Sequence, residues 1–306
     1  MPGRVCCIVN PAAAGGRARE RWTNARAALR RGGFPLEERF TEAQGDGIRL
    51  ARAAAADFDH LVAVGGDGTV GEVASGLIQS GAPTSLALMP TGTGNDVATQ
   101  LGIRSCDTAV DVLVAGGPPR RLDAIEVRSS EGGREVVRHA LLFAAVGFAG
   151  ELLRQTTPRV KRWFGPRFCY SVGFLRALVS YRAPEVRVET DDERFAGRWL
   201  HVCAGNSAWA GGGAMHLSPG ARWDDGALDL CLIQALSRAA TAVQFPKLVR
   251  GTFVGHPAVR YFRGTRLAIA TDNPIPLQLD GDLVGSTPAT FSIHPGAVRI
   301  LAPRPA

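Results

Sequence analysis

The spacing of hydrophobic and polar positions along the chain changes near residue 120. Before that point, short apolar runs alternate with amphipathic stretches of helical length. This β-α-β-α pattern is typical of a parallel sheet with helices on both faces. We therefore expect an α/β domain over residues 1–120. Its predicted strands are 4–10, 36–40, 61–64 and 85–89, and its predicted helices are 17–31, 47–56, 70–79, 96–101 and 107–115.

Beyond residue 120 the apolar positions mostly recur at every second residue, and turn signals are closely spaced. This pattern predicts an antiparallel β-sandwich domain over residues 121–306, with the last strands able to pack back on the first domain. One helical segment, 164–181, is expected to interrupt it. The predicted strands are 122–129, 136–146, 185–190, 194–204, 227–233, 266–271, 276–279, 289–294 and 297–301.

Two glycine-rich loops follow neighbouring predicted strands. The first is Gly65-Gly66-Asp67-Gly68-Thr69, and the second is Pro90-Thr91-Gly92-Thr93-Gly94-Asn95-Asp96. Glycines let a ligand approach bare N–H groups, and such groups at a helix N-terminus seat phosphate oxygens. Because the loops are about one β-α-β unit apart, they predict a nucleotide site at the carboxyl edge of the sheet.

The overall charge suggests an anionic partner. The 306 residues carry a net charge of +7, with a pI of about 9.5. A basic surface suits anionic membranes, nucleic acid or polyphosphates. No nucleic-acid recognition motif accompanies the charge, so we expect no nucleic-acid partner.

The chain enters its first strand without a signal peptide and contains no apolar run of 18 residues. We expect a cytoplasmic protein, peripheral to the inner face of the membrane. A homodimer formed through an exposed strand is left open. No H-x-x-x-H or H-E-x-x-H spacing is present, so zinc is not expected, and His294 is assigned a structural role.

Two acidic segments stand out in the second domain: Asp224-Asp225-Gly226 and Asp280-Gly281-Asp282. An Asp-Gly pair is ordinary turn chemistry between strands. A hairpin turn alone does not explain the second acid at Asp282. Both the turn and a catalytic role therefore remain open at this stage.

Together, the two glycine loops and Asp280-Gly281-Asp282 resemble the soluble bacterial diacylglycerol kinase family, over the whole chain. That family is related to sphingosine and ceramide kinases and, more distantly, to NAD kinases and phosphofructokinases. The resemblance implies a nucleotide-binding α/β domain of NAD kinase type followed by a β-sandwich, with the active site in the cleft between them. It also implies ATP, Mg²⁺ and a lipid substrate at the membrane surface.

The resemblance further implies roles for individual residues. Asp280 is the expected base for the acceptor hydroxyl, assisted by Asp282. Asp67, Asp96 and Asp123 are expected around a catalytic Mg²⁺, largely through water. Asp225, with the carbonyls of Arg222 and Ala227, is expected to hold a structural Mg²⁺. The expected ATP contacts are Asn10, Pro11, Ala12, Ala13, Ala14, Thr41, Gly65, Gly66, Asp67, Gly68, Thr69, Glu72, Thr93, Gly94 and Asn95.

Several positions depart from the family pattern, and two of them bear on activity: Gly71 stands where asparagine is usual, and Asp282 where glutamate is usual. They support one alternative, a non-catalytic member that binds nucleotide or lipid. The other alternative is a soluble metabolite kinase of NAD kinase type, phosphorylating NAD instead of a lipid.

The segment 159–170 is rich in arginine and aromatic residues and leads into the apolar stretch 174–179. It predicts either an interfacial element that touches the membrane or a helix packed on the sandwich. The glycine-rich stretch 206–213 is interpreted either as part of the lining of the lipid pocket or as a turn with no ligand role.

Overall fold

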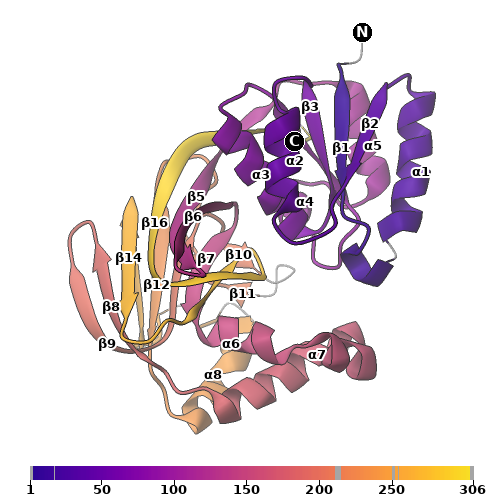
Figure 1. The fold of residues 1–306 in the computed structure, drawn as a ribbon. Helices are drawn as coiled ribbons and strands as arrows, with labels where there is room; N and C mark the ends of the chain where they lie inside the picture. The colour runs from indigo at the N-terminus through magenta and orange to yellow at the C-terminus, as the bar shows by residue number, and fades with distance from the viewer. Residues whose placement is uncertain (1–2, 17, 211–214, 250–251, 254, 304–306) are drawn as a thin grey trace. The chain divides into compact units, whose positions relative to one another are not determined.

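A computed structural model describes the chain except for residues 1–2, 17, 211–214, 250–251, 254 and 304–306 (Figure 1). The chain divides into two compact units. The first unit combines Met1–Ala124 with Pro295–Ala306, and the second is Ile125–His294. The predicted boundary at residue 120 falls at the first residue of strand β5 (Arg120–Glu131).

The first unit is built on a parallel sheet in the order β4-β3-β1-β2. These strands are β1 (Val5–Val9), β2 (Leu36–Phe40), β3 (His60–Gly65) and β4 (Ser85–Pro90). Every residue of β1 and β4 is buried, as expected for strands covered on both faces. The end of β16 (Asp282–Ile300) joins this sheet, where Ile300 pairs in parallel with Leu86.

Helices connect the parallel strands of the first unit. They are α1 (Ala18–Arg31), α2 (Asp46–Ala54), α3 (Asp67–Ser80), α4 (Asp96–Gln100) and α5 (Cys106–Ala115), with the short 3₁₀ turn η1 (Ala13–Gly16). The predicted elements of this half lie where the structure has them, to within a few residues at their ends. Strong local alternation between buried strands and amphipathic helices explains that agreement.

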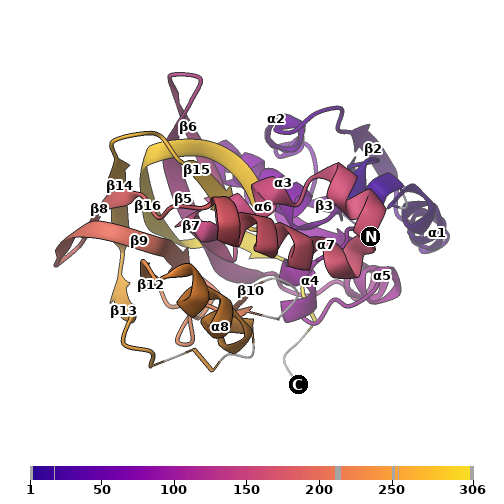
Figure 2. The same cartoon turned by 90° about the horizontal axis from the view of Figure 1, so that it is seen from below.

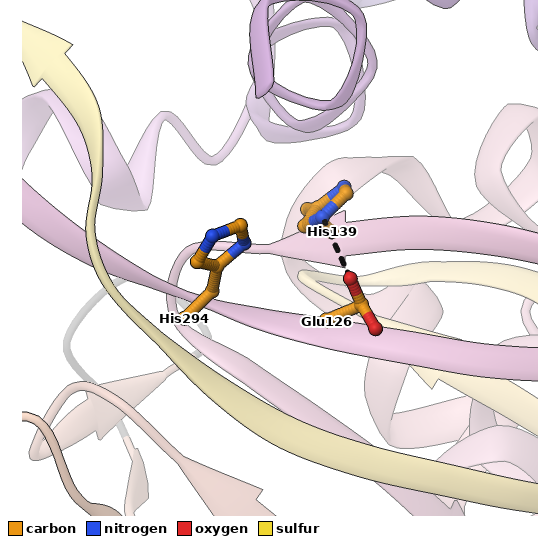
Figure 3. Close-up of side chains that lie close together, drawn as sticks. All are labelled: Glu126, His139 and His294. Atoms are coloured by element: carbon orange, nitrogen blue, oxygen red, sulfur yellow. Dashed lines mark ion pairs between the residues drawn. The ribbon is translucent and has the colours of Figure 1, made fainter. Parts of the chain in front are cut away.

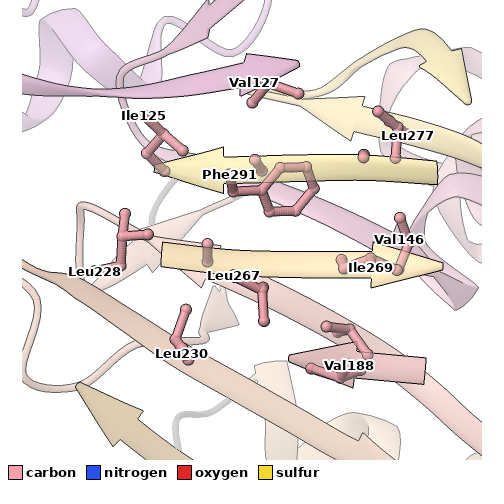
Figure 4. Packing of buried hydrophobic residues seen from close by; sticks show 14 of the residues in the cluster. Ile125, Val127, Val146, Val188, Leu228, Leu230, Leu267, Ile269, Leu277 and Phe291 are labelled. Carbon is pink, nitrogen blue, oxygen red and sulfur yellow. The ribbon is translucent and has the colours of Figure 1, made fainter. Parts of the chain in front are cut away.

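The second unit is dominated by antiparallel strands that enclose a hydrophobic core (Figure 4). Phe291, Leu267, Leu277 and Leu228 are fully buried in it. Its further strands are β6 (Arg134–Ala140), β7 (Phe143–Gly147), β8 (Glu185–Thr190), β9 (Arg194–Gly205), β10 (Trp209–Ala210), β11 (Met215–His216), β12 (Leu228–Gln234), β13 (Val259–Gly264), β14 (Arg266–Thr271) and β15 (Pro276–Leu279). The predicted α/β domain followed by a β-sandwich is confirmed.

The expectation of a single helical segment in the second half is wrong. The described residues form three helices there: α6 (Phe148–Gln155), α7 (Pro158–Ser180) and α8 (Arg238–Val249) (Figures 1 and 2). Helix α6 has only eight residues, too few to be recognised directly after a strand, and α8 contains Pro246, which normally interrupts a helix. The two longer helices meet where the rings of Phe174 and Phe245 stack, with centroids 3.9 Å apart.

Two strand predictions are also corrected. The single strand expected over 136–146 is interrupted at Leu141-Leu142, between β6 and β7. The two strands expected over 289–294 and 297–301 form one strand, β16. None of the helices within the described ranges combines the length and the apolar character that crossing a membrane requires.

Candidate active site

The two glycine loops of the first unit lie against each other. The carbonyl of Gly65 accepts hydrogen bonds from the amides of Thr91 and Gly92, both at 3.0 Å. A Cβ atom added at Gly92 would lie only 2.4 Å from the Cα of Gly66. The close approach of two main chains therefore requires glycine at position 92.

The first loop leads directly into the N-terminus of α3. Gly66 occupies the N-cap position and has no side chain with which to cap the first turn of the helix. The first amides of a helix carry partial positive charge and bind anions. Asn10 supports this turn, because its Nδ2 donates a 3.1 Å hydrogen bond to Oγ1 of Thr69. The arrangement offers main-chain donors to phosphate oxygens.

Asp67 lies between this turn and the second loop. Its Oδ1 accepts a 3.0 Å hydrogen bond from the amide of Val97, in the first turn of α4. Burial raises the pKa of the Asp67 carboxyl, and the neighbouring Asp96 adds to that rise, while hydrogen bonds from α4 amides oppose it. The structure thus brings Asp67 and Asp96 together, as expected for two members of the acidic network.

The third acid, Asp123, is buried and fastens the C-terminal strand to the first unit. Its Oδ1 accepts a 2.7 Å hydrogen bond from the amide of Gly296. Among the described residues, the donor atoms of Asp67, Asp96 and Asp123 do not form one direct coordination group. Any ion that they share would be held through water.

The side chain of Glu72 accepts hydrogen bonds from the N-terminus of helix α2. Its two carboxylate oxygens accept hydrogen bonds from the amides of Gly45 and Gly47, at 2.7 and 2.9 Å. Gly45 is the N-cap residue of α2 and has no side chain with which to cap that end. Glu72 therefore acts as the anionic cap of α2 from outside the helix. The structure adds this structural role to the predicted nucleotide contact.

The loop after β1 is held by its own first residue. Oδ1 of Asn10 accepts a 3.0 Å hydrogen bond from the amide of Ala12, beyond Pro11. Ala14, one residue after Ala13, has a φ of 51°, a left-handed conformation that costs an alanine roughly 1 kcal/mol. Thr41 is anchored beside β1, because its amide donates to the carbonyl of Val9 at 2.9 Å.

The second loop is organised by Asn95. Its side-chain amide both accepts from and donates to the main chain of Gly92, at 3.0 and 3.1 Å. Thr93 and Gly94, between these two residues, are exposed to solvent. Gly68, in the first loop, and Gly71, in the second turn of α3, add no side chain to the site.

Sequence reasoning missed Arg21 of α1. Its guanidinium donates to the carbonyl of Gly92 at 3.4 Å, so one cationic side chain reaches the second loop. Arginine is frequent along this chain, and nothing in its local sequence distinguishes Arg21 from its neighbours. Only the packing of α1 identifies it.

In the second unit, Asp280 and Gly281 form the two-residue turn between β15 and β16. Leu279 pairs with Asp282, and both turn residues have positive φ, 46° and 97°. This conformation matches a type I′ turn, for which Asp-Gly is a preferred pair. The turn interpretation of this motif is therefore correct for the backbone.

The side chain of Asp280 nevertheless does more than shape a turn. It is buried, and its carboxylate accepts hydrogen bonds from three consecutive amides at the break between β6 and β7. Leu141 donates to Oδ2 at 2.7 Å, and Leu142 and Phe143 donate to Oδ1 at 2.9 Å. Asp282, by contrast, is exposed.

Asn206 fixes the same strand break from the other side. Its main-chain amide donates to the carbonyl of Leu142 at 2.8 Å, and its side-chain Nδ2 donates to the carbonyl of Leu141 at 3.0 Å. Asn206 is fully buried, in the bend that follows β9. It is a positioning residue for the amides that hold Asp280. Residues 211–214 of that stretch lie outside the described residues.

At the predicted structural Mg²⁺ site, Asp225 contacts a cationic side chain. One carboxylate oxygen accepts from the guanidinium of Arg263, and the other accepts from the amide of Ala227 at 3.2 Å. Arg222 lies at the start of the same turn, with its Nη2 3.7 Å from Oδ1 of Asp224. The negative charge expected to attract Mg²⁺ is thus already compensated by Arg263.

The predicted interfacial segment lies in α7. The side chains at 159, 161, 162, 164–168 and 170 are outside the described residues. Trp163 is described and is 78% exposed. Leu175 and Val179, one helical turn apart, are also exposed.

Comparison with known families gives two matches along the chain. The family described as "Diacylglycerol kinase catalytic domain" matches residues 4–127, and the "YegS C-terminal NAD kinase beta sandwich-like domain" matches residues 152–302. A diacylglycerol kinase of Staphylococcus carnosus is 30% identical over 267 residues, covering 86% of this chain and 83% of that protein.

Two further relatives agree with this assignment. A protein of Chromohalobacter salexigens named "Probable lipid kinase YegS-like" is 29% identical, over 90% of this chain and 86% of that protein. The solved structure of a diacylglycerol kinase from Bacillus anthracis has the same fold, with a TM-score of 0.70, 21% identity and coverage of 99% of this chain and 98% of that chain. The chain belongs to the bacterial diacylglycerol kinase family and is a kinase whose phosphoryl acceptor is a lipid hydroxyl.

Proposed function

We propose that this lipid kinase transfers the γ-phosphate of ATP, in the presence of Mg²⁺, to the hydroxyl of diacylglycerol or a closely related lipid. The observation that carries the proposal is the pairing of the two glycine loops at Gly66 and Gly92, next to the N-terminus of α3, whose N-cap residue is a glycine. That arrangement offers main-chain donors, which is what a polyphosphate needs and a neutral ligand does not.

Phosphoryl transfer depends on in-line positioning and charge neutralisation more than on covalent chemistry. The amides of the first turn of α3 would bind phosphate oxygens, and Arg21 adds positive charge at the second loop. Asp67 and Asp96 supply the carboxylate oxygens that suit Mg²⁺, which would neutralise the phosphate charge when bound. Membership of the family supports a nucleotide as the phosphoryl donor. The pair Asp67 and Asp96 supports the dependence on Mg²⁺.

Asp280 is the proposed acceptor of the proton from the lipid hydroxyl. Three main-chain amides orient its carboxylate. Such anchoring gives the side chain one orientation, which favours a residue that must meet a hydroxyl along a defined line. Asp282, exposed at the start of β16, is proposed to assist.

We further propose that the protein works in the cytoplasm at the inner face of the membrane, binding no nucleic acid. Exposed Trp163, Leu175 and Val179 on α7 support contact with the acyl boundary. A vesicle assay tests this part. Trp163→Ala combined with Arg162→Glu should reduce sedimentation with anionic vesicles, and unchanged binding would remove the membrane role.

The decisive experiment for the chemistry incubates purified protein with labelled ATP, Mg²⁺ and vesicles of a total lipid extract, followed by thin-layer chromatography. A parallel arm replaces the lipid with NAD. We expect label in a phosphorylated lipid, none in NADP, and loss of transfer when Mg²⁺ is chelated. Transfer to NAD would instead support a metabolite kinase. ATP binding by calorimetry without transfer to any lipid would support a non-catalytic member.

A matched pair of variants assigns the activity to the site. Asp67→Asn should reduce transfer by at least about a hundredfold, because the carboxylate beside the phosphates is lost. Asp57→Asn alters an exposed acid of the same unit and should leave transfer unchanged. Equal activity of the two variants would contradict the assignment.

A further inference from the structure

Three side chains outside the proposed kinase chemistry come together on neighbouring strands of the second unit (Figure 3). Glu126 on β5 lies directly opposite His139 on β6 in the antiparallel register. His294 is on β16, which also pairs with β5. Cross-strand neighbours have Cβ atoms about 5 Å apart, so their functional groups can share one ligand.

The geometry of this cluster, formed by Glu126, His139 and His294, suits a metal ion. One donor atom from each residue lies within 4.8 Å of the other two. Nε2 of His139 is 3.9 Å from Oε2 of Glu126, too long for a hydrogen bond. Two ligands of a tetrahedral zinc ion, each at about 2.1 Å, are separated by about 3.4 Å. Reorientation of the exposed His294 side chain, together with a shortening of the His139–Glu126 distance by about half an ångström, would bring the set to that spacing.

The carboxylate of the cluster is held in place. His139 is buried, and its Nε2 faces Oε2 of Glu126. Arg128 binds Oε1 of Glu126 at 2.8 Å and orients the carboxylate with Oε2 toward His139.

We propose that Glu126, His139 and His294 bind one divalent transition-metal ion, with Zn²⁺ as the preferred ion. Two imidazoles and one carboxylate are a recurrent zinc ligand set, and Mg²⁺ prefers oxygen ligands alone. Water would occupy the fourth position on the side of exposed His294. The ion would fasten β5, β6 and β16 to one another, separately from the Mg²⁺ of phosphoryl transfer.

The sequence could not reveal this site. The ligands are separated by 13 residues (139 minus 126) and by 155 residues (294 minus 139), so no local histidine spacing exists. The expectation that zinc is absent rested on local spacing alone. Pairing of three strands, which sequence periodicity does not specify, creates the ligand set.

The test uses untagged, metal-stripped protein titrated with Co²⁺ and then with Zn²⁺. We expect one equivalent of Co²⁺ to give visible absorption bands of a four-coordinate site, and Zn²⁺ to displace it. One equivalent of Zn²⁺ should also raise the melting temperature, since the ion binds the folded state. Absence of binding at micromolar Zn²⁺ would overturn the proposal.

Variants locate the ion. His294→Ala, at an exposed position, should weaken Zn²⁺ binding at least about tenfold and abolish the thermal shift. Glu126→Gln keeps the shape of the side chain and should weaken binding as well. His216→Ala and Cys106→Ser alter potential ligands outside the cluster and should bind as the parent does. Parent-like affinity in His294→Ala would show that the metal binds elsewhere and would overturn the assignment.

Discussion

The main-chain amide of Leu141 donates a 2.7 Å hydrogen bond to Oδ2 of Asp280, a residue 139 positions later in the chain. With the amides of Leu142 and Phe143, it surrounds the carboxylate with donors. Leu141 and Leu142 belong to neither strand, and Phe143 begins β7, so the interruption between β6 and β7 directs three consecutive amides at one carboxylate. The break in the sheet thus holds the proposed catalytic carboxylate in one orientation.

Asp280→Asn is expected to reduce both stability and activity. Any orientation of the asparagine amide places its NH₂ group against at least one main-chain donor. The mismatch should lower the free energy of unfolding by about 1–3 kcal/mol in urea titration. Transfer to lipid should fall at least a hundredfold in protein shown to be folded. Asp282→Asn, at an exposed position, should leave stability unchanged, and near-normal turnover of Asp280→Asn would remove Asp280 from the reaction.

Asn206→Ala tests whether the strand break positions Asp280. The variant loses the hydrogen bond from Nδ2 to the carbonyl of Leu141 and should be destabilised by about 1–3 kcal/mol. We expect kcat to fall while KM for ATP stays unchanged, because the change acts on the proton acceptor alone. Asn273→Ala, in an exposed turn, is the control. An increase in KM for ATP with unchanged kcat would contradict the positioning role.

Gly92→Ala should separate the two glycine loops. The new methyl group would meet the main chain of Gly66 at 2.4 Å, so the loops must move and ATP affinity should fall more than tenfold. Gly117→Ala is a matched control, because a Cβ at that position meets nothing within 4 Å. ATP binding by calorimetry compares the two. Equal affinities would mean that close contact of the loops is not needed for nucleotide binding.

Glu72→Gln separates the structural role of this residue from nucleotide binding. The substitution removes the negative charge at the N-terminus of α2 and one of two acceptors. A cap of this kind contributes about 1 kcal/mol, so we expect a loss of that size in the free energy of unfolding. ATP affinity should change less than threefold. A large loss of affinity without any loss of stability would instead favour a direct contact with ATP.

Stability should depend on pH through His201. This residue is fully buried in β9, and burial lowers its pKa to about 4 from an ordinary 6.5. The neutral form is favoured by folding, so its contribution is complete above pH 6.5 and is lost as pH falls toward 4. The slope is at most about 1.4 kcal/mol per pH unit. His201→Gln should flatten this part of the curve in urea titrations between pH 4 and 7, and an unchanged slope would show that other groups dominate.

The first half of the chain could be predicted from local pattern. Buried strands such as 61–64 end in glycines, and these signals lie within a few residues of each other, so periodicity and turn chemistry identify them. Gly65–Thr69 and Gly92–Asn95 could be assigned to one edge because parallel strands bring their carboxyl ends together. The family resemblance rested on these two loops together with Asp280-Gly281-Asp282.

Tertiary structure determined the features of the site that depend on residues far apart in the sequence. The break at Leu141-Leu142 looks like continuous strand, yet Asp280 and Asn206 make it an amide-donating turn. Glu72 caps a helix that begins 26 positions earlier, at Asp46, and Arg263 meets Asp225 across 38 residues. The sequence by itself determined the order of elements and the loops that face phosphate, because those follow from neighbouring residues. The anchoring of the carboxylates and the grouping of Glu126 with two histidines came from long-range strand pairing, whose register no local pattern encodes.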